Sequence, residues 1–283
     1  SLAASFLPSI SGGDRFDEIP RPITIRDALT HTSGLGEYPV RGKHWSLEEF
    51  SKSIAHEPLR FSPGSRWRYS TAGIDVLGRV VEVVSGESFV QFLQKRLFDP
   101  LDMNDTTFWL NAEDEVRFAR NYEFDEKAKR LKEIEIYYMN GGAVTDRERA
   151  PSGGAGLFST AEDLAIFYRM MLNKGAWNGR RILKSSTVAE MTRIQTGDLQ
   201  ARSGMPWGLG FCVIENPSQM EANRHYTPGT FGHGGAHGTS SWVDPSTGII
   251  YVFMIQRGRL RPNPDNSSML IAFQNAAAKA LGR

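Results

Sequence analysis

The sequence has only one cysteine, Cys212, so it cannot form a disulfide within the chain. Cys212 lies in an apolar, strand-like run, which favours a small buried side chain over a reactive thiol. No apolar run reaches the roughly 20 residues that a membrane-spanning helix needs, and residues 1–10 do not show the pattern of a signal peptide. These features leave an exported and a cytoplasmic location equally open.

The sequence also lacks an excess of charge of either sign, since Lys plus Arg number 33 and Asp plus Glu number 32. So close a balance produces no long-range field that would attract nucleic acid or an anionic membrane. We therefore expect a small neutral or zwitterionic molecule as the partner. The 283 residues are 40% apolar and 23% charged, which is typical of a globular protein and excludes disordered and fibrous classes.

Several common site motifs are absent. The sequence has no G-x-S-x-G, no Walker A motif, no G-x-G-x-x-G, no CxxC and no H-E-x-x-H, so the usual α/β-hydrolase, nucleotide-binding and zinc-protease interpretations lose their support. His233 and His237 are four positions apart, which would suit a metal pair on a helix. The glycines between and around them make a helix improbable, and we expect no metal there.

Local signals predict a mainly helical region over 20–205. An apolar residue recurs every three or four positions from Ala72, which predicts a helix that ends at Gly86. Another helix is expected to end before Pro100, and a third to close at Gly175. Three capping-box spacings mark helix starts: Thr24 with Asp27, Ser88 with Gln91, and Ser159 with Glu162.

The region 206–283 has a different character, with short runs rich in aromatic and β-branched residues separated by turn signals. A last helix is expected from Asp265 or Asn266, and it can cover one face of a sheet. The fold class is therefore α+β, with an antiparallel sheet flanked by helices. The strand-like runs are 209–214, 230–234, 239–243 and 249–255, and residues 119–138 are expected to form a separate hairpin or an excursion over the surface.

Three motifs could carry chemistry, and their order along the chain is informative. Residues 29–35 read Leu-Thr-His-Thr-Ser-Gly-Leu, residues 69–71 read Tyr-Ser-Thr before the long predicted helix, and residues 233–235 read His-Gly-Gly in the strand region. In this order they resemble the serine β-lactamase-like family, which includes class C β-lactamases, D-Ala-D-Ala carboxypeptidases, D-aminopeptidases and esterases. The family motifs are Tyr-x-Asn and Lys-Thr-Gly or His-x-Gly. Similarity at 98–103 and 153–160 extends the resemblance over nearly the whole chain.

The family's first motif, Ser-x-x-Lys, supplies the nucleophile and its lysine partner, yet no serine in this sequence is followed three positions later by lysine. Residues 2–8 look like the family segment downstream of the nucleophile helix. We therefore expect the nucleophile upstream of this chain. The resemblance then implies that 1–283 is a single β-lactamase/DD-peptidase-like catalytic domain, truncated at its N-terminus, with the N-terminal part of the sheet missing. An uncovered strand edge favours self-association or a partner chain that completes the sheet.

The resemblance implies hydrolysis through an acyl-serine intermediate, without a cofactor. Tyr69 would be the base or proton relay, and its ordinary pKa of about 10 calls for nearby positive charge, which the missing lysine provides in the family. Thr71 replaces the family's asparagine, so the amide that would hold a substrate acylamide becomes a shorter hydroxyl. This difference favours esters or small amides over β-lactams, and it is equally compatible with a loss of catalysis.

The same resemblance assigns roles in the strand region. Gly234 and Gly235 would let the backbone approach the substrate, and the N–H of Ala236 would donate to the oxyanion. His233 stands where penicillin-recognising members often have lysine. Because imidazole is mostly neutral near pH 7, it attracts a substrate carboxylate weakly, and β-lactams that carry a carboxylate should be poorer substrates.

Each motif also has a purely structural interpretation. Tyr69 can be a packed tyrosine with a satisfied hydroxyl, and His233 can be part of a turn. We interpret His31 and Ser33 as a structural turn in which the Ser33 hydroxyl bonds the backbone, with Ser33 as a fallback nucleophile. The order and spacing of the motifs favour the family interpretation.

Three hypotheses follow for function. The leading one is a serine hydrolase acting on an ester or on a D-amino-acid peptide or amide. The second is a catalytically inactive family member that serves as a binding or assembly module. The third is one piece of a two-chain or swapped assembly, in which a partner restores the missing strands and the serine.

Overall fold

The computed structural model describes residues 21–36, 45–136, 143–200, 202–220, 225–258 and 268–282. The chain forms two compact units: unit 1 comprises Ser1–Asn111 and Tyr137–Phe158, and unit 2 comprises Ala112–Ile136 and Ser159–Arg283. Within the described ranges, no helix has both the length and the apolar character needed to cross a membrane. The predicted single catalytic domain over 1–283 and the predicted regions 20–205 and 206–283 stay predictions.

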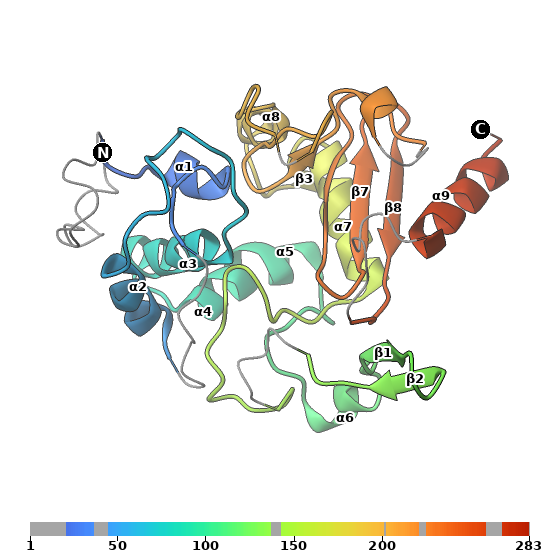
Figure 1. Ribbon diagram of the computed structural model, residues 1–283, viewed down its shortest axis with the longest axis horizontal. Coiled ribbons are helices and arrows are strands. Elements are labelled where there is room, and N and C mark those ends of the chain that lie inside the picture. The colour runs from blue at the N-terminus through green and yellow to red at the C-terminus, as the bar shows by residue number, and fades with distance from the viewer. Residues whose placement is uncertain are drawn as a thin grey trace. The chain divides into compact units, whose positions relative to one another are not determined.

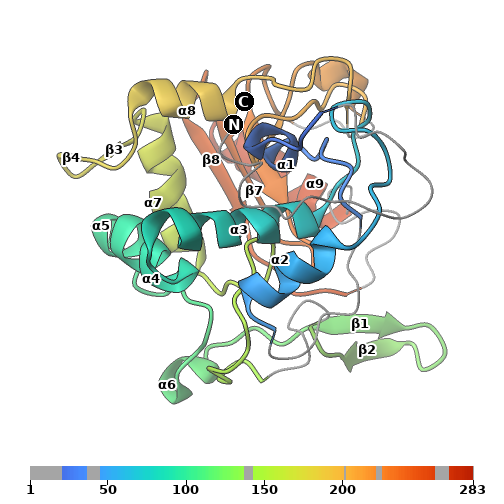
Figure 2. The same ribbon diagram turned by 90° about the vertical axis from the view of Figure 1, so that its left-hand side faces the viewer.

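Unit 1 is organised around helix α3, against which α1, α2 and α4 pack (Figure 2). The Ser70 hydroxyl caps the start of α3 by accepting the N–H of Gly73, and Gly86 ends it in the left-handed conformation at φ 72°. This confirms the helix predicted from the apolar spacing. The elements of unit 1 are α1 (Ile25–Leu29), α2 (Leu47–Ala55), α3 (Thr71–Ser85), α4 (Phe89–Leu93), the π-helix η2 (Gln94–Phe98) and α5 (Asp99–Leu101).

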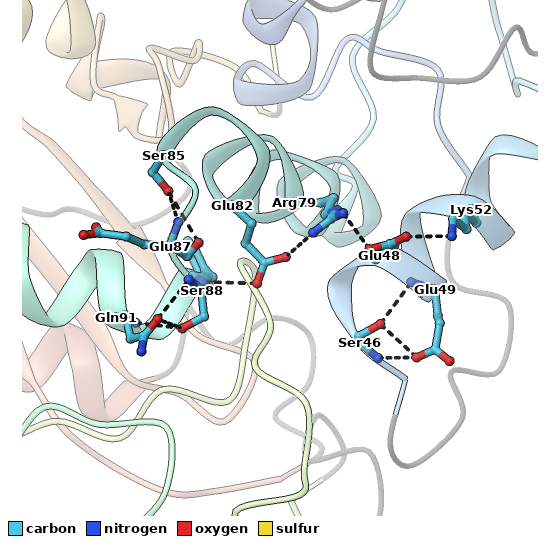
Figure 3. Close-up of polar contacts among 11 residues, drawn as sticks. Ser46, Glu48, Glu49, Lys52, Arg79, Glu82, Ser85, Glu87, Ser88 and Gln91 are labelled. Atoms are coloured by element: carbon cyan, nitrogen blue, oxygen red, sulfur yellow. Dashed lines mark hydrogen bonds and ion pairs between the residues drawn. The ribbon is translucent and has the colours of Figure 1, made fainter.

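Polar contacts, most of them partly buried, join three helices of unit 1 (Figure 3). Glu48 of α2 accepts hydrogen bonds from Lys52 and from Arg79 of α3, each at 2.6 Å. Arg79 also donates to Glu82 at 3.1 Å, and Glu82 accepts the N–H of Phe89 at the start of α4 at 3.1 Å. Because these groups lie at the surface, they orient the helices more than they stabilise them. The free energy of folding of this region comes mainly from burial of an apolar cluster, to which α2 contributes Phe50 and Ile54 and α3 contributes Val76.

Two helix boundaries in unit 1 differ from expectation. The helix capped by Ser88 was predicted to end before Pro100, and this is wrong, because η2 carries the chain directly into α5. Pro100 lies in the first turn of α5, where the N–H that proline lacks is not needed, and the wider π-turn changes the hydrogen-bond register ahead of it. Helix α2 was not predicted, although Ser46 and Glu49 form a complete capping box at its start.

Unit 2 contains a four-stranded antiparallel sheet in the order β5-β6-β7-β8, which confirms the predicted meander. Helix α7 covers one face, where the Tyr168 hydroxyl bonds the Ser241 hydroxyl at 2.9 Å. Helix α9 lies on the other face, where Phe273 stacks on Phe253 with ring centroids 5.0 Å apart (Figure 1). These elements are α7 (Ala161–Leu172), β5 (Cys212–Val213), β6 (Phe231–Gly234), β7 (Ser240–Asp244), β8 (Ile249–Phe253) and α9 (Ser268–Ala280).

The start of α7 lies one residue later than predicted. Thr160, and not Ser159, is the N-cap, because Thr160 has the extended backbone that a cap requires and its hydroxyl accepts the N–H of Asp163 at 3.2 Å. The Thr160 carbonyl then accepts the N–H of Leu164, which opens the helix. Gly175, which was predicted to close this helix, has the left-handed backbone expected there, with φ 88°.

The remaining elements of unit 2 are short. The predicted hairpin is confirmed, and Asp125 closes its turn by accepting the N–H groups of Lys127 and Ala128, each at 2.9 Å. The predicted start of the last helix, at Asp265 or Asn266, lies outside the described residues. The short elements are α6 (Ala112–Glu115), β1 (Tyr122–Asp125), β2 (Arg130–Glu133), β3 (Ala176–Trp177), β4 (Arg180–Arg181), α8 (Ser185–Thr192) and the 3-10 helix η3 (Pro217–Gln219).

Candidate active site

Tyr69 lies immediately before α3 in unit 1, and 39% of its surface is exposed. It therefore does not have the enclosed environment of a packed core tyrosine. Ser70, the next residue, has extended backbone (φ −140°, ψ 106°), and its side chain is 2% exposed. The chain thus presents a half-open phenol at the start of a helix whose first turn is fixed by the buried Ser70 cap.

His31 contacts this segment from the turn after α1. Its ring centroid lies 4.3 Å from that of Tyr69, with the two planes tilted by 38°. Its Nδ1 accepts the N–H of Ser70 at 3.2 Å, and its backbone carbonyl accepts the N–H of Arg68 at 2.9 Å. The sequence favours a structural role for His31 in the turn, and it contains no signal that His31 contacts the candidate proton relay.

The turn that carries His31 is held by buried polar groups. Asp27 accepts hydrogen bonds from Arg21 and from the backbone N–H and hydroxyl of Thr24. Burial alone would raise the pKa of Asp27, but the bonds from Arg21 and Thr24 outweigh it and hold this pKa below its ordinary value. Ser33 is 1% exposed, and its Oγ accepts the N–H of Leu35 at 3.3 Å, in agreement with the structural interpretation of this serine.

A glycine-containing segment crosses the start of α3. Thr71 is the first residue of α3, and a Cβ placed on Gly154 would lie 2.3 Å from its methyl group. The fully buried carboxylate of Asp75 accepts the Ser152 hydroxyl at 2.6 Å and the N–H of Gly154 at 3.2 Å. Thr71 therefore packs directly under this segment. Asp75 and Ser152 were not predicted as part of this region, although a carboxylate within an apolar helical stripe is a usable signal in the sequence.

His233 lies in β6 of unit 2, directly opposite Ser241 of β7, so it is part of a strand and not of a turn. The ring is half-buried and meets the edge of Trp207, with centroids 5.5 Å apart and planes at 89°. Its Nδ1 bonds the carbonyl of Gly234. A carbonyl can only accept, so Nδ1 carries the proton and the neutral ring has its lone pair on Nε2.

A tight turn connects β6 to β7. The N–H of Gly235 donates to the Thr239 carbonyl at 2.6 Å, and a Cβ on Gly235 would lie 2.0 Å from the Thr239 hydroxyl, which would have to move to admit a larger residue. Gly238 has φ 92° and donates to the Gly235 carbonyl at 3.0 Å. Ala236 is exposed at the outside of this turn, and its N–H donates to no group within the described residues. An exposed N–H of this kind is suited to an incoming oxyanion.

His237 lies in the same turn but faces inward. It is 7% exposed, and burial lowers the pKa of its ring. His233 and His237 are on a strand and a turn, so their spacing does not form a helical metal pair. Over the ranges that the structure describes, no three or more His, Cys, Asp or Glu side chains gather as metal ligands would.

The predicted site residues therefore fall into two groups. Tyr69 and Thr71 flank Ser70 in unit 1, while the four residues 233–236 form the end of β6 and its turn in unit 2. The family model described as Beta-lactamase matches residues 6–275 of the chain. The chain belongs to the Beta-lactamase family. This confirms the resemblance drawn from the three motifs, and with it the α+β β-lactamase-like fold.

Proteins with esterase and carboxypeptidase names are similar to the chain. Esterase EstB of Burkholderia gladioli is 31% identical over 262 residues, covering 82% of this chain and 64% of EstB. A putative D-alanyl-D-alanine carboxypeptidase of Salmonella paratyphi A is 26% identical, covering 90% of this chain and 62% of that protein. The chain thus spans under two thirds of the length of these curated relatives.

A solved structure supports the same fold. EstCE1, described as a hydrolase with promiscuous acyltransferase activity, superposes with a TM-score of 0.74 at 27% identity. The superposition covers 96% of this chain and 74% of EstCE1. The names of these relatives support a serine-hydrolase type of function for the family to which the chain belongs.

Proposed function

We propose that the protein is a serine hydrolase that cleaves an ester, or a D-amino-acid peptide or amide, through an acyl-serine intermediate. Its nucleophile would be supplied by a Ser-x-x-Lys segment upstream of these residues. The observation that carries this proposal is the half-open phenol of Tyr69, held at the start of α3 in the second motif of a Beta-lactamase family chain. The exposed position of Ala236, to which the resemblance assigns the oxyanion donor, also supports it.

The proposed reaction assigns one step to each group. Tyr69 takes the proton of the serine hydroxyl as the serine oxygen attacks the substrate carbonyl carbon. The Ala236 N–H and the N–H of the serine hold the oxyanion of the tetrahedral intermediate. The intermediate collapses, the leaving group takes the proton from Tyr69, and water then hydrolyses the acyl-serine by the same route. Glycine at 234 and 235 lets the substrate lie close to the β6 backbone.

Two residues favour an ester over a β-lactam as the substrate. Thr71 offers a short hydroxyl where the family has an amide, and its methyl group packs against Gly154. His233 in its neutral form lacks the positive charge with which a lysine would bind a substrate carboxylate. An uncharged ester or small amide needs neither the side-chain amide of asparagine nor the positive charge of lysine for binding. The name of EstB agrees with this preference.

The second candidate function is that of a binding or assembly module without catalysis. Two observations favour it: Thr71 stands in place of the family's asparagine, and no serine among the 283 residues is followed three positions later by lysine. A module of this kind would keep the fold and bind a ligand at the same strand end, but it would form no covalent acyl intermediate.

The decisive experiment measures intact mass after incubation with a fluorophosphonate. The 283-residue chain, the product of the complete open reading frame and its Tyr69→Phe variant are compared. We expect labelling of the longer product only, slowed about 10²- to 10⁴-fold by Tyr69→Phe because the proton relay is lost. Tyr122→Phe, in the β1 strand of unit 2, is the matched control and should label at the wild-type rate.

Each other outcome has a definite meaning. If neither form is labelled, the binding module is favoured over the hydrolase. If the 283-residue chain itself is labelled, the nucleophile lies within it and the upstream Ser-x-x-Lys segment is not required.

A further inference from the structure

The two N–H groups that flank Tyr69 both donate to one residue. The N–H of Arg68 donates to the carbonyl of His31 at 2.9 Å, and the N–H of Ser70 donates to its Nδ1 at 3.2 Å. The imidazole also lies 4.3 Å from the phenol ring between them. His31 therefore contacts the ring of Tyr69 and hydrogen-bonds the residues immediately before and after it.

The backbone of His31 is in an unusual conformation. Its φ is 60°, in the left-handed region that side-chain-bearing residues rarely adopt, and it is 2% exposed. Such strain persists only where the surroundings determine it, and it is concentrated at functional sites. Two contacts surround His31 here. The Trp67 ring meets the imidazole edge-on, with ring centroids 5.8 Å apart, and the N–H of the next residue, Thr32, donates to the backbone carbonyl of Asp27.

We infer that His31 is a positioning residue that holds Tyr69 in place for proton transfer by accepting the Ser70 N–H at Nδ1. The inference rests on the function proposed above. Because Nδ1 accepts, the neutral ring carries its proton on Nε2. Proton transfer from the nucleophile requires the phenol oxygen within hydrogen-bond reach, and displacement of a group by about 1 Å can cost about 10²-fold in rate. Tyr69 is 39% exposed, and His31 contacts both its ring and the backbone on either side of it.

Two substitutions in the complete gene product separate the acceptor from the ring. His31→Asn keeps an acceptor oxygen at nearly the same position as Nδ1 and tolerates left-handed backbone, but it loses the ring. His31→Phe keeps an aromatic ring against Tyr69 and loses the acceptor. We expect His31→Phe to slow phosphonylation of the serine by the fluorophosphonate about 10- to 100-fold, with KM for p-nitrophenyl acetate changed less than about 3-fold. His31→Asn should stay within about 5-fold of wild type on both measures.

Controls address folding and packing. Tyr122→Phe, in strand β1 of unit 2, contacts none of these groups and should react with the fluorophosphonate at the wild-type rate. Circular dichroism and the Tm identify any variant that has failed to fold. If a variant fails to fold, the ¹⁵N chemical shifts of His31 in the wild-type protein are measured instead, because they distinguish an accepting Nδ1 from a protonated one.

The outcomes distinguish this inference from the proposed function. An unlabelled wild-type protein would overturn both. A labelled wild type in which folded His31→Phe reacts at the same rate overturns the inference alone. Slowing of His31→Asn equal to or greater than that of His31→Phe also overturns it, because the acceptor that asparagine keeps would then fail to preserve the rate. A protonated Nδ1 in the wild-type spectrum has the same meaning.

Discussion

Asp27 is the residue on which the turn after α1 depends. Its carboxylate, with 8% of the side chain exposed, accepts two hydrogen bonds from Arg21, at 2.6 and 2.8 Å, and the N–H and hydroxyl of Thr24 at 2.8 and 2.7 Å. The turn that follows contains His31, which contacts Tyr69. The position of the candidate proton relay is thus linked to a carboxylate that takes no part in the proposed chemistry.

We expect Asp27→Asn to lower the free energy of unfolding by about 1–3 kcal/mol at pH 7, because a neutral amide replaces a charged acceptor of several bonds. The folded-state pKa of Asp27 is lowered, so its contribution is complete above the unfolded pKa of about 4 and is lost as the pH falls through the folded-state pKa. Urea unfolding of wild type and variant should therefore show a gap that narrows on acidification. A gap of constant size would contradict this, and Asp114→Asn, at an exposed ion pair, should change little.

Strand β6 depends on a glycine that allows close pairing with β7. A Cβ on Gly232 would lie 2.2 Å from the Ser241 carbonyl oxygen and 2.8 Å from the Trp242 Cα. These are backbone atoms of the paired strand, so they cannot move aside without loosening the ladder that also holds His233 opposite Ser241. The element that presents the third motif is thus specified by a glycine outside that motif.

Gly232→Ala should lower the free energy of unfolding by about 2–3 kcal/mol through this overlap. Gly248→Ala is the matched control, because φ is 72° there but a Cβ would meet no atom within 4 Å, and it should cost only about 1 kcal/mol of backbone strain. Thermal or urea unfolding of both variants measures the difference. A loss at Gly232 no greater than that at Gly248 would show that β7 can move away from β6 cheaply.

The whole molecule interleaves its two units along the chain, which passes between them at 111/112, 136/137 and 158/159. Each unit is therefore built from two separate segments of the chain. When one unit unfolds, the ends of the segments that form the other unit are no longer held in place. We expect the complete gene product to unfold in a single calorimetric transition with equal van't Hoff and calorimetric enthalpies. Two resolved transitions would contradict this and would also count against the predicted single domain over 1–283.

Signals that involve neighbouring residues were accessible from the sequence alone. The capping boxes at Thr24 and Ser88, the left-handed glycine at 86 and the order of the C-terminal strands depend on hydrogen bonds and side-chain alternation over a few positions. The three motifs identified the family because their order and spacing are also properties of the chain alone. The same local logic selected Ser159 instead of Thr160, since both spacings suit a cap and only the folded backbone separates them.

Contacts between distant residues were decided by the tertiary structure. His31 and Ser70 are 39 positions apart, and Asp75 and Ser152 are 77 apart, so no spacing rule connects them. Which groups restrain Tyr69 depends on how α1, α3 and the segment after residue 150 pack, and packing sums many weak contacts that a linear pattern does not encode. The sequence by itself thus determined the family, the fold class and the candidate residues, whereas only the fold determined the environment in which each of them lies.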